Sequence, residues 1–338
     1  MKIDIEFNSG AQLPMDAIPE LARLAEAHGF DCAWGGEANN KDPTVMLSAI
    51  AAVTNRLNVG SAVYHILGRT PATLALQAAG LDELSSGRFL LGIGSSNPTI
   101  AKWHGQSMDH PLGRVEEYVE IARAAMRGEK LNFSGKYFSS QNFKMAFKPS
   151  GRRIPIYLAA FGPMMTRLAG RVADGVLINM ANPAEIRRIA SEVRAGAQEA
   201  GKDPAAMEII CKVRCSIAKN CSTARDALSH ALAYYALADY YRELLGRMGF
   251  AGEVEAMRAA WKSEGFHAAR RLITDRMFHS LPLVAATSAG EVVEQIQPYA
   301  EAGATRIILP YVAASENLVD EMKSFIEYWT PATTGALG

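Results

Sequence analysis

The sequence predicts an α/β fold, a single (β/α)8 TIM barrel that spans residues 1–338 and carries insertions. Short apolar or β-branched segments bounded by turn residues recur along the chain, and each is followed by a stretch of helical periodicity. The 338 residues, 49% of them hydrophobic and 21% charged, are enough to bury a large core. A doubly wound open sheet is the alternative, but it fits the same alternation less well than a closed parallel barrel.

Four strand–helix units are predicted in the first half of the chain. Asp16 is expected to cap the first helix and Gly29 to end it, because these residue types favour helix starts and stops. Pro43 and Pro71 lie at expected first turns, where proline is tolerated. The strands are expected at 2–7, 31–34, 57–63 and 89–93, and the helices at 16–28, 43–54, about 71–84 and 113–127.

The second half continues the pattern after an excursion at about 130–149, which is rich in aromatic, serine and glycine residues and is typical of a hairpin. Strands are expected at 154–159, 175–178, 207–217 and 305–309. Helices are expected from 162, at 183–200 and at 315–329. The segment at about 218–304 has strong helical propensity and is interpreted as a helical insertion between the seventh and eighth strands.

Composition excludes several classes of partner. Lys plus Arg equals Asp plus Glu at 35 each, so there is no general positive charge to hold nucleic acid or an anionic membrane. No apolar stretch approaches ~18 residues, and the N-terminus lacks an apolar signal core, which predicts a cytoplasmic protein. The four cysteines lack the spacing of a metal site and are expected to be buried free thiols.

In a parallel barrel the chemistry collects at the C-terminal ends of the strands, and three ionisable side chains are expected there. Glu6 closes the first strand, pointing either into the barrel mouth or to solvent. Glu37 follows the paired glycines after the second strand, and His65 follows the third. Each is a candidate proton donor, and each also has a structural interpretation as a hydrogen-bonded acid, a solvated acid or a structural histidine.

Two segments favour contact with a phosphate or sugar. The loop after the fourth strand, Gly94, Ser95, Ser96 and Asn97, offers backbone N–H groups, but Pro98 follows where the dinucleotide fingerprint needs a third glycine. The second segment is Ala160, Phe161, Gly162, Pro163 and Met164, where a strand ends and a helix begins. Unpaired N–H groups and the helix dipole attract anions there, although an ordinary βα turn has the same pattern. No metal-ligand spacing is evident.

These segments, in this order, resemble the luciferase-like flavin and deazaflavin oxidoreductases, especially the coenzyme F420-dependent methylenetetrahydromethanopterin reductases. Leu84-Ser85-Ser86-Gly87-Arg88 is typical of the whole superfamily. Gly162-Pro163-Met164-Met165 is more similar to the F420 branch. The match covers most of the chain, including 1–7, 27–34, 69–72, 81–94, 154–157 and 168–179.

The resemblance implies a non-prolyl cis peptide between Ala62 and Val63 behind the coenzyme ring. It also implies that Gly94 to Asn97 and Ala160 to Met164 hold the side chain and phosphate of the coenzyme, and that Glu6 is a pocket glutamate. Where many relatives have an Asp-His pair, this chain has Glu37-Ala38. His65 is therefore expected to replace the lost proton donor.

The expected function is hydride transfer between a bound F420 and an electrophilic carbon of a small-molecule substrate, such as an iminium, imine, carbonyl or activated alkene. An FMN-dependent monooxygenase on the same fold is the first alternative. A cofactor-free binding barrel is the second, motivated by the missing Asp-His pair. Relatives of this kind are dimers or tetramers, so a homodimer or homotetramer is expected.

Overall fold

A computed structural model describes residues 1–7 and 13–335. Its centre is a nine-stranded parallel sheet that closes on itself where β3 pairs with β5. The two-residue strand β4 (Tyr64–His65) follows β3 and, like β3, pairs with β5, so β3 and β4 together form one position of the ring. The closed barrel therefore has eight strand positions, and the predicted TIM barrel is confirmed. The other strands of the ring are β1 (Lys2–Glu6), β2 (Cys32–Gly35), β3 (Asn58–Ser61), β5 (Phe89–Gly94), β8 (Ile156–Ala159), β9 (Gly175–Asn179), β10 (Glu208–Lys212) and β13 (Arg306–Pro310).

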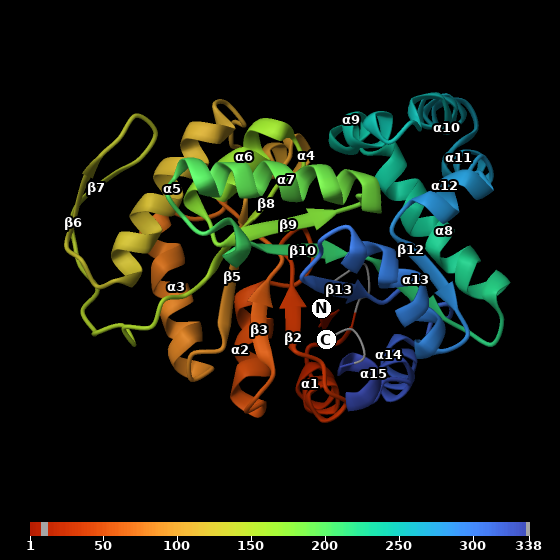
Figure 1. Cartoon of the computed structure of the whole chain (residues 1–338), viewed down its shortest axis with the longest axis horizontal. Helices are drawn as coiled ribbons and strands as arrows, with labels where there is room; N and C mark the ends of the chain where they lie inside the picture. The colour runs from red at the N-terminus through yellow and green to blue at the C-terminus, as the bar shows by residue number, and fades with distance from the viewer. Residues whose placement is uncertain (8–12, 336–338) are drawn as a thin grey trace.

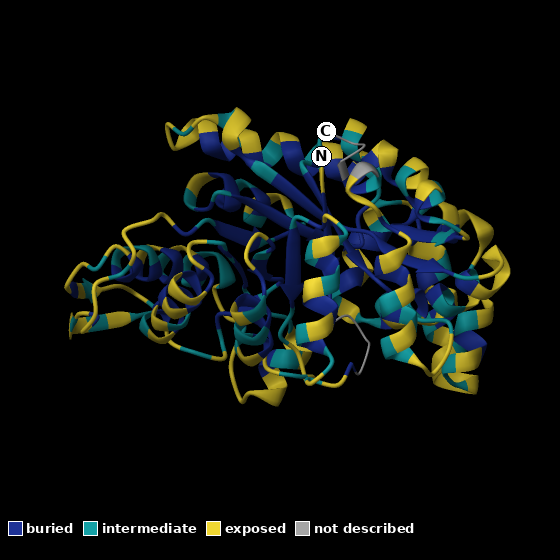
Figure 2. Cartoon of the chain, turned by 90° about the horizontal axis from the view of Figure 1, so that it is seen from below, coloured by how far each residue is buried: buried dark blue, intermediate teal, exposed yellow. Residues whose placement is uncertain are grey.

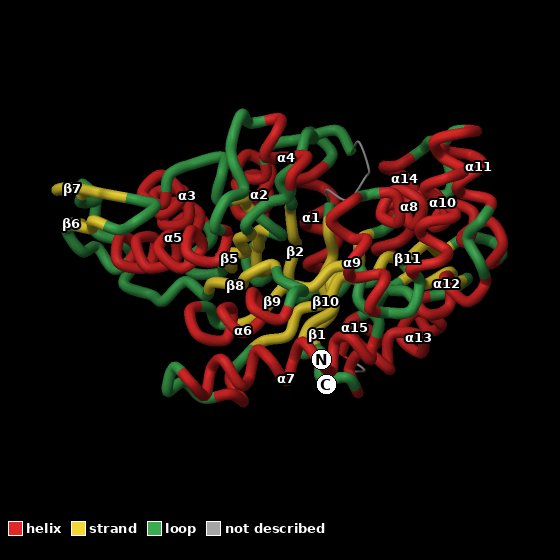
Figure 3. The backbone as a smooth tube through the Cα atoms, turned by 90° about the horizontal axis from the view of Figure 1, so that it is seen from above, coloured by secondary structure: helices red, strands yellow, loops and turns green. Residues whose placement is uncertain are grey.

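Helices surround the barrel on its outer side (Figure 3), and most begin with a proline in the first turn. The first helix begins at Ile18 after an Ala17 N-cap, so the prediction that Asp16 caps it is wrong. Its end is as expected, since Gly29 has a φ of +86°. The helices that follow the strands are α1 (Ile18–Ala27), α2 (Pro43–Val53), α3 (Pro71–Leu84), α4 (Pro98–Trp103), α5 (Pro111–Met126), α6 (Pro163–Val172), α7 (Pro183–Glu199), α13 (Ala289–Glu301), α14 (Leu318–Glu327) and α15 (Pro331–Gly335).

Side chains alternate along each barrel strand between the interior and the helix layer. On β1, Ile3 and Ile5 belong to the large apolar cluster beneath the helices. Asp4 and Glu6, which alternate with them, are also buried and therefore face the barrel interior. The barrel strands form the dark, buried centre of Figure 2, while most of the exposed residues lie on the outer helix faces, the loops and the β-hairpin at 131–143. Polar interior residues are thus held inside an apolar shell.

The segment at 207–217, predicted as one strand, is divided. β10 (Glu208–Lys212) lies between β9 and β13 in the barrel, whereas β11 (Arg214–Ile217) pairs with β12 (Leu283–Ala286) in a separate two-stranded sheet. The segment 218–304 is helical except for β12, and it ends in α13, which belongs to the helix layer of the barrel. Its helices are α8 (Cys221–Leu237), α9 (Asp239–Arg247), α10 (Ala251–Glu264), α11 (Phe266–Arg271) and α12 (Asp275–Ser280), and they share an apolar cluster of their own.

Two further additions lie at opposite sides of the barrel in Figure 1. An antiparallel hairpin of β6 (Leu131–Ser134) and β7 (Ser139–Phe143) extends beside α5, and α9 to α12 form the opposite side. Among the described residues, no helix is long and apolar enough to cross a membrane. Three cysteines are buried free thiols as expected, but Cys221 is exposed at the first turn of α8.

Candidate active site

A buried ion pair lies at the C-terminal end of the barrel interior. The Lys212 Nζ at the end of β10 donates to Glu6 Oε1 at 2.9 Å, and the two side chains are 9% and 4% exposed. Glu6 Oε2 is buried as well and has no hydrogen-bond partner. Since an unpaired buried carboxylate oxygen is costly, this atom is poised to accept a hydrogen bond from a group that enters the barrel mouth. Of the two orientations considered for Glu6, the structure selects the inward one.

The same lysine fixes the backbone after β3. Its Nζ also donates to the Ala62 carbonyl oxygen at 2.9 Å, and the peptide bond between Ala62 and Val63 is cis, as the resemblance implied. Gly36 closes this cluster from β2, because a Cβ there would lie 2.8 Å from the Ala62 oxygen and 3.7 Å from Glu6 Oε1. Three loops distant in sequence therefore converge on one backbone segment.

Glu37 forms a second charged cluster beside the first. Both of its carboxylate oxygens accept from the Arg69 guanidinium, at 2.9 and 2.5 Å, and Oε2 also accepts from the His65 backbone N–H at 2.9 Å. A carboxylate held bidentately by arginine is fixed in geometry. Both oxygens of Glu37 are therefore already engaged by the protein, which gives this residue a positioning role beside His65.

The imidazole of His65 is 3% exposed, and neither ring nitrogen has a hydrogen-bond partner. Its Nε2 lies 3.5 Å from Glu37 Oε2, and its ring centroid is 4.7 Å from that of His104 on the loop after α4. Burial lowers the pKa of His65 below its ordinary value of 6.5, and the neighbouring His104 and Arg69 lower it further, while Glu37 acts in the opposite direction. The ring is therefore neutral at neutral pH and retains one N–H.

The loop after β5 is shaped for close contact. A Cβ on Gly94 would meet the Val63 side chain and Ala159 at 3.1 and 3.3 Å. Ser96 has a φ of +79°, and its buried hydroxyl has no partner. Asn97 caps α4 by accepting from the Thr99 and Ile100 N–H groups, so its side-chain oxygen already has a structural role. Ser95 lies half-buried between them.

At the next loop, Gly162 is the N-cap of α6 and provides no side-chain cap. Pro163 occupies the first turn, and Met164 is 71% exposed, so the first N–H groups of this ten-residue helix face outward. Nothing lies within 4 Å of a Cβ built on Gly162. The Phe161 carbonyl accepts from Arg188 and Arg247 at 2.7 and 3.2 Å, and Ala160 is buried behind it. The segment is an open helix N-terminus with arginines nearby.

The helical segment after β11 covers this end of the barrel. Arg214, which is 3% exposed, donates to Asn179 Oδ1 at 2.7 Å and to the Tyr235 hydroxyl, and its guanidinium lies 4.2 Å from the Tyr235 ring centroid. Asn179 also donates to Tyr241, whose ring stacks on Phe161 at 5.9 Å. These contacts connect the ends of β8, β9 and β11 to α8 and α9.

Sequence reasoning placed Glu6, Ala62 and Val63 in one cluster with the loop containing Gly94, and the structure brings them together. It missed Lys212, Arg69 and Arg214. Lys212 and Arg214 were visible as two cations inside the largely apolar segment 207–217. Buried charges need partners, so these two residues were a usable signal for a carboxylate or another ligand.

Comparison with known proteins identifies the family of the chain. The family model for luciferase-like monooxygenases matches residues 4–306. A 5,10-methylenetetrahydromethanopterin reductase of Archaeoglobus fulgidus is 30% identical over 91% of this chain and 92% of its own length. Another of the same name, from Methanolobus tindarius, is 34% identical over 65% of this chain and 68% of its own.

Solved structures show the same fold. The coenzyme F420-dependent tetrahydromethanopterin reductase of Methanopyrus kandleri superposes with a TM-score of 0.84 at 23% identity, covering 97% of this chain and 98% of its own. The monooxygenase RslO1 of Streptomyces bottropensis gives 0.68 at 21% identity, covering 97% and 98%. The relatives are thus reductases and monooxygenases built on one barrel. The chain belongs to the luciferase-like monooxygenase family.

Proposed function

We propose that the protein is a coenzyme F420-dependent oxidoreductase that moves hydride to or from an electrophilic carbon of a small molecule. The substrate class is an iminium, an imine, a carbonyl or an activated alkene. The observation that carries the proposal is Glu6, a buried carboxylate at the barrel mouth with one oxygen held by Lys212 and the other without a partner. The reductase of Methanopyrus kandleri, which is named as coenzyme F420-dependent, supports F420 over other coenzymes.

The residues at this end of the barrel fit a flat ring with an anionic side chain. Ala62 and Val63 offer backbone beside Gly36 and Gly94, where a Cβ would fill the available space. Ser96 has an unpartnered buried hydroxyl, which suits a polar side chain. The open α6 N-terminus at residues 160–164 would hold a phosphate through its N–H groups.

When bound, F420 supplies a hydride carrier at C5, and the protein supplies orientation and proton management. Glu6 would accept a hydrogen bond at its free Oε2, while Lys212 holds the other oxygen of its carboxylate in place. His65, neutral and with both ring nitrogens unpartnered, would donate a hydrogen bond through its one N–H to the substrate, because its lowered pKa leaves little imidazolium to act as an acid at neutral pH. Glu37 would position His65 and the adjoining backbone, because Arg69 already occupies both of its oxygens.

An FMN-dependent monooxygenase is the second candidate, since the same fold carries monooxygenases such as RslO1. A reduced flavin reacts with oxygen and needs a site that excludes water, whereas a deazaflavin is nearly inert to oxygen. Titration of the purified protein with F420 and separately with FMN, followed by fluorescence quenching, distinguishes the two. Tight F420 binding with weak FMN binding is expected. The opposite preference would refute the proposal, and binding of neither would favour a cofactor-free barrel.

Catalysis is tested on the F420-loaded protein with a panel of iminium and carbonyl substrates. The Glu6→Gln variant should retain F420 binding and lose turnover by about 100-fold or more. Glu255→Gln, a matched change on the exposed face of α10, should leave both unchanged. Equal turnover of the Glu6→Gln variant and the wild type would remove Glu6 from the reaction.

A further inference from the structure

A cavity of about 680 Å³ lies at the end of the barrel opposite the candidate active site. It is bordered by the C-terminal turns of α5 and α6 and by the segment that leads into β8. In a TIM barrel this N-terminal face is remote from the chemistry, so the cavity is not an extension of the active site. Its volume falls in the range of small-molecule sites, ~300–1,000 Å³.

The cavity is lined by an unusual concentration of cations. They are Arg123, Arg127, Arg152, Arg153, Arg171 and Lys202, and no carboxylate is among the described residues that line it. Asp174 pairs with Arg123 and Arg153, and Glu129 pairs with Arg127. Six cations against these two carboxylates leave an excess of four positive charges in a chain whose formal net charge is zero.

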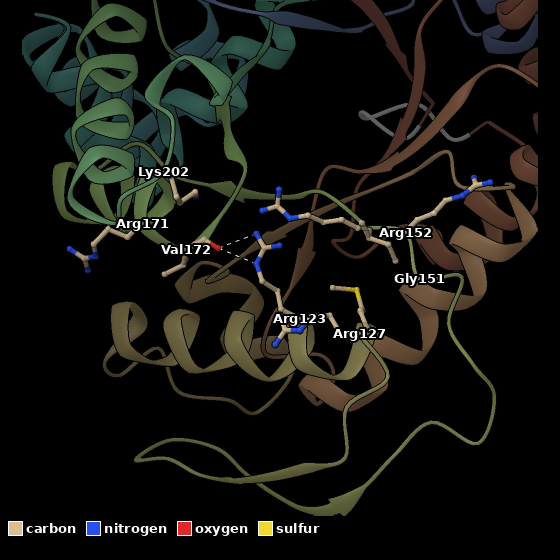
Figure 4. Close-up of a pocket in the computed structure, with 10 residues that line it drawn as sticks. Arg123, Arg127, Gly151, Arg152, Arg171, Val172 and Lys202 are labelled. Carbon is tan, nitrogen blue, oxygen red and sulfur yellow. Dashed lines mark hydrogen bonds between the residues drawn. The ribbon is translucent and has the colours of Figure 1, made fainter.

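Part of this charge has a structural role. Arg123 donates to the Val172 carbonyl at the end of α6 (Figure 4), and Lys202 donates to the Gly170 and Ala173 carbonyls. Cations are favoured at helix C-termini, which accounts for these two residues. It does not account for Arg153, whose side chain is 69% exposed and pairs with Asp174. Arg127 is the C-cap residue of α5, but its side chain is 60% exposed and contacts Glu129 rather than a helix carbonyl in the described structure.

The adjoining cavity provides an internal comparison. It has a volume of about 600 Å³ and shares Arg153 and Lys202 with the first, but Asp174, Asp203 and Glu208 balance them. The excess of positive charge is therefore confined to the first of the two neighbouring cavities. Burial lowers the pKa of Lys202, although nearby Asp174 opposes this, and Arg123 and Arg153 lower it further, so the cations there repel one another.

We propose that this arginine-lined cavity binds a small multivalent anion that carries phosphoryl or carboxylate groups. Arginine recognises both groups through paired N–H donors, and the apolar floor of Met126, Ile154 and Val172 would contact the body of the ligand. A recessed hollow of this volume fits a compact organic anion rather than a long polymer.

The test is calorimetric titration of the whole protein with inorganic pyrophosphate at constant ionic strength. The double variant Arg127→Gln/Arg153→Gln removes two exposed cations and should weaken binding at least about tenfold. The charge-matched control Arg23→Gln/Arg56→Gln changes two exposed arginines outside the cavity and should bind as the wild type does.

Citrate, titrated in the same way, distinguishes a carboxylate ligand from a phosphoryl ligand, and arginine-dependent binding of either supports the site. Absence of binding in the wild type would overturn the proposal. So would equal affinity of the wild type and the Arg127→Gln/Arg153→Gln variant, because these two cations of the cavity would then contribute nothing to binding. Both results leave the coenzyme proposal unaffected, since F420 titration is read separately.

Discussion

Replacing Lys212 with methionine tests whether the Glu6–Lys212 pair organises the barrel mouth. The substitution keeps an unbranched side chain of similar length but removes the ammonium group that contacts Glu6 Oε1 and the Ala62 carbonyl, each at 2.9 Å. Glu6 is 4% exposed and would be left with neither carboxylate oxygen partnered. Breaking a buried ion pair from one side costs about 3–5 kcal/mol, and we expect the free energy of unfolding to fall by that amount at neutral pH.

Urea denaturation followed by circular dichroism measures the effect. The double variant Glu6→Gln/Lys212→Met should be more stable than Lys212→Met alone, because it leaves no unpaired charge. Lys262→Met, on the exposed face of α10, is the control. A loss below about 1 kcal/mol for Lys212→Met, equal to the control, would refute the reasoning.

Three further predictions concern the same end of the barrel. Gly36→Ala should cost about 1–3 kcal/mol and weaken F420 binding, because its Cβ would lie 2.8 Å from a backbone oxygen. Gly80→Ala, in an open helical position, should instead stabilise by up to about 1 kcal/mol, and thermal denaturation that ranked the two variants in the opposite order would contradict both. Because burial lowers the pKa of His65 from 6.5, the unfolded chain binds its proton more readily, and stability should fall as the pH drops below 6.5. His65→Gln should flatten that slope in urea titrations, and an unchanged slope would assign it to other groups. Arg69→Gln should cost about 2 kcal/mol in urea denaturation by releasing Glu37, whereas a neutral effect would show that the bidentate contact is dispensable.

The barrel was predictable because its signals are local. Each strand–helix unit contains its own signal, a short apolar segment followed by a stretch of helical periodicity. A proline in the first turn marks many of the helix starts. The first helix was mispredicted at Asp16 because a residue type that caps helices is also common in the turn before them. Local preference alone does not fix the first helical residue.

The division of residues 207–217 was not predictable for a different reason. Both halves have the same alternation, but β10 pairs within the barrel and β11 pairs with β12, about 70 residues later. The strand with which a segment pairs depends on the path of the rest of the chain, and local alternation does not specify that path. The contact between Glu6 and Lys212, which are 206 residues apart, could not be predicted from the sequence for the same reason.

Two buried ion pairs inside the same barrel show how structural and functional charges differ. In the pair nearer the N-terminal end, both oxygens of Asp4 accept from Arg306, and Oδ2 also accepts from the Trp34 indole. Every oxygen of that carboxylate is satisfied by the protein, so nothing further is needed to hold it. Glu6 lies two residues on, where the strand reaches the active-site end, and it keeps one oxygen unpaired. Of the four carboxylate oxygens in the two pairs, Glu6 Oε2 alone lacks a partner, and it lies at the end where chemistry collects, although Arg306 Nε in the other pair is also buried without one. A group that arrives from outside and donates to Glu6 Oε2 would offset the cost, and this asymmetry is the strongest physical reason to place the reaction there.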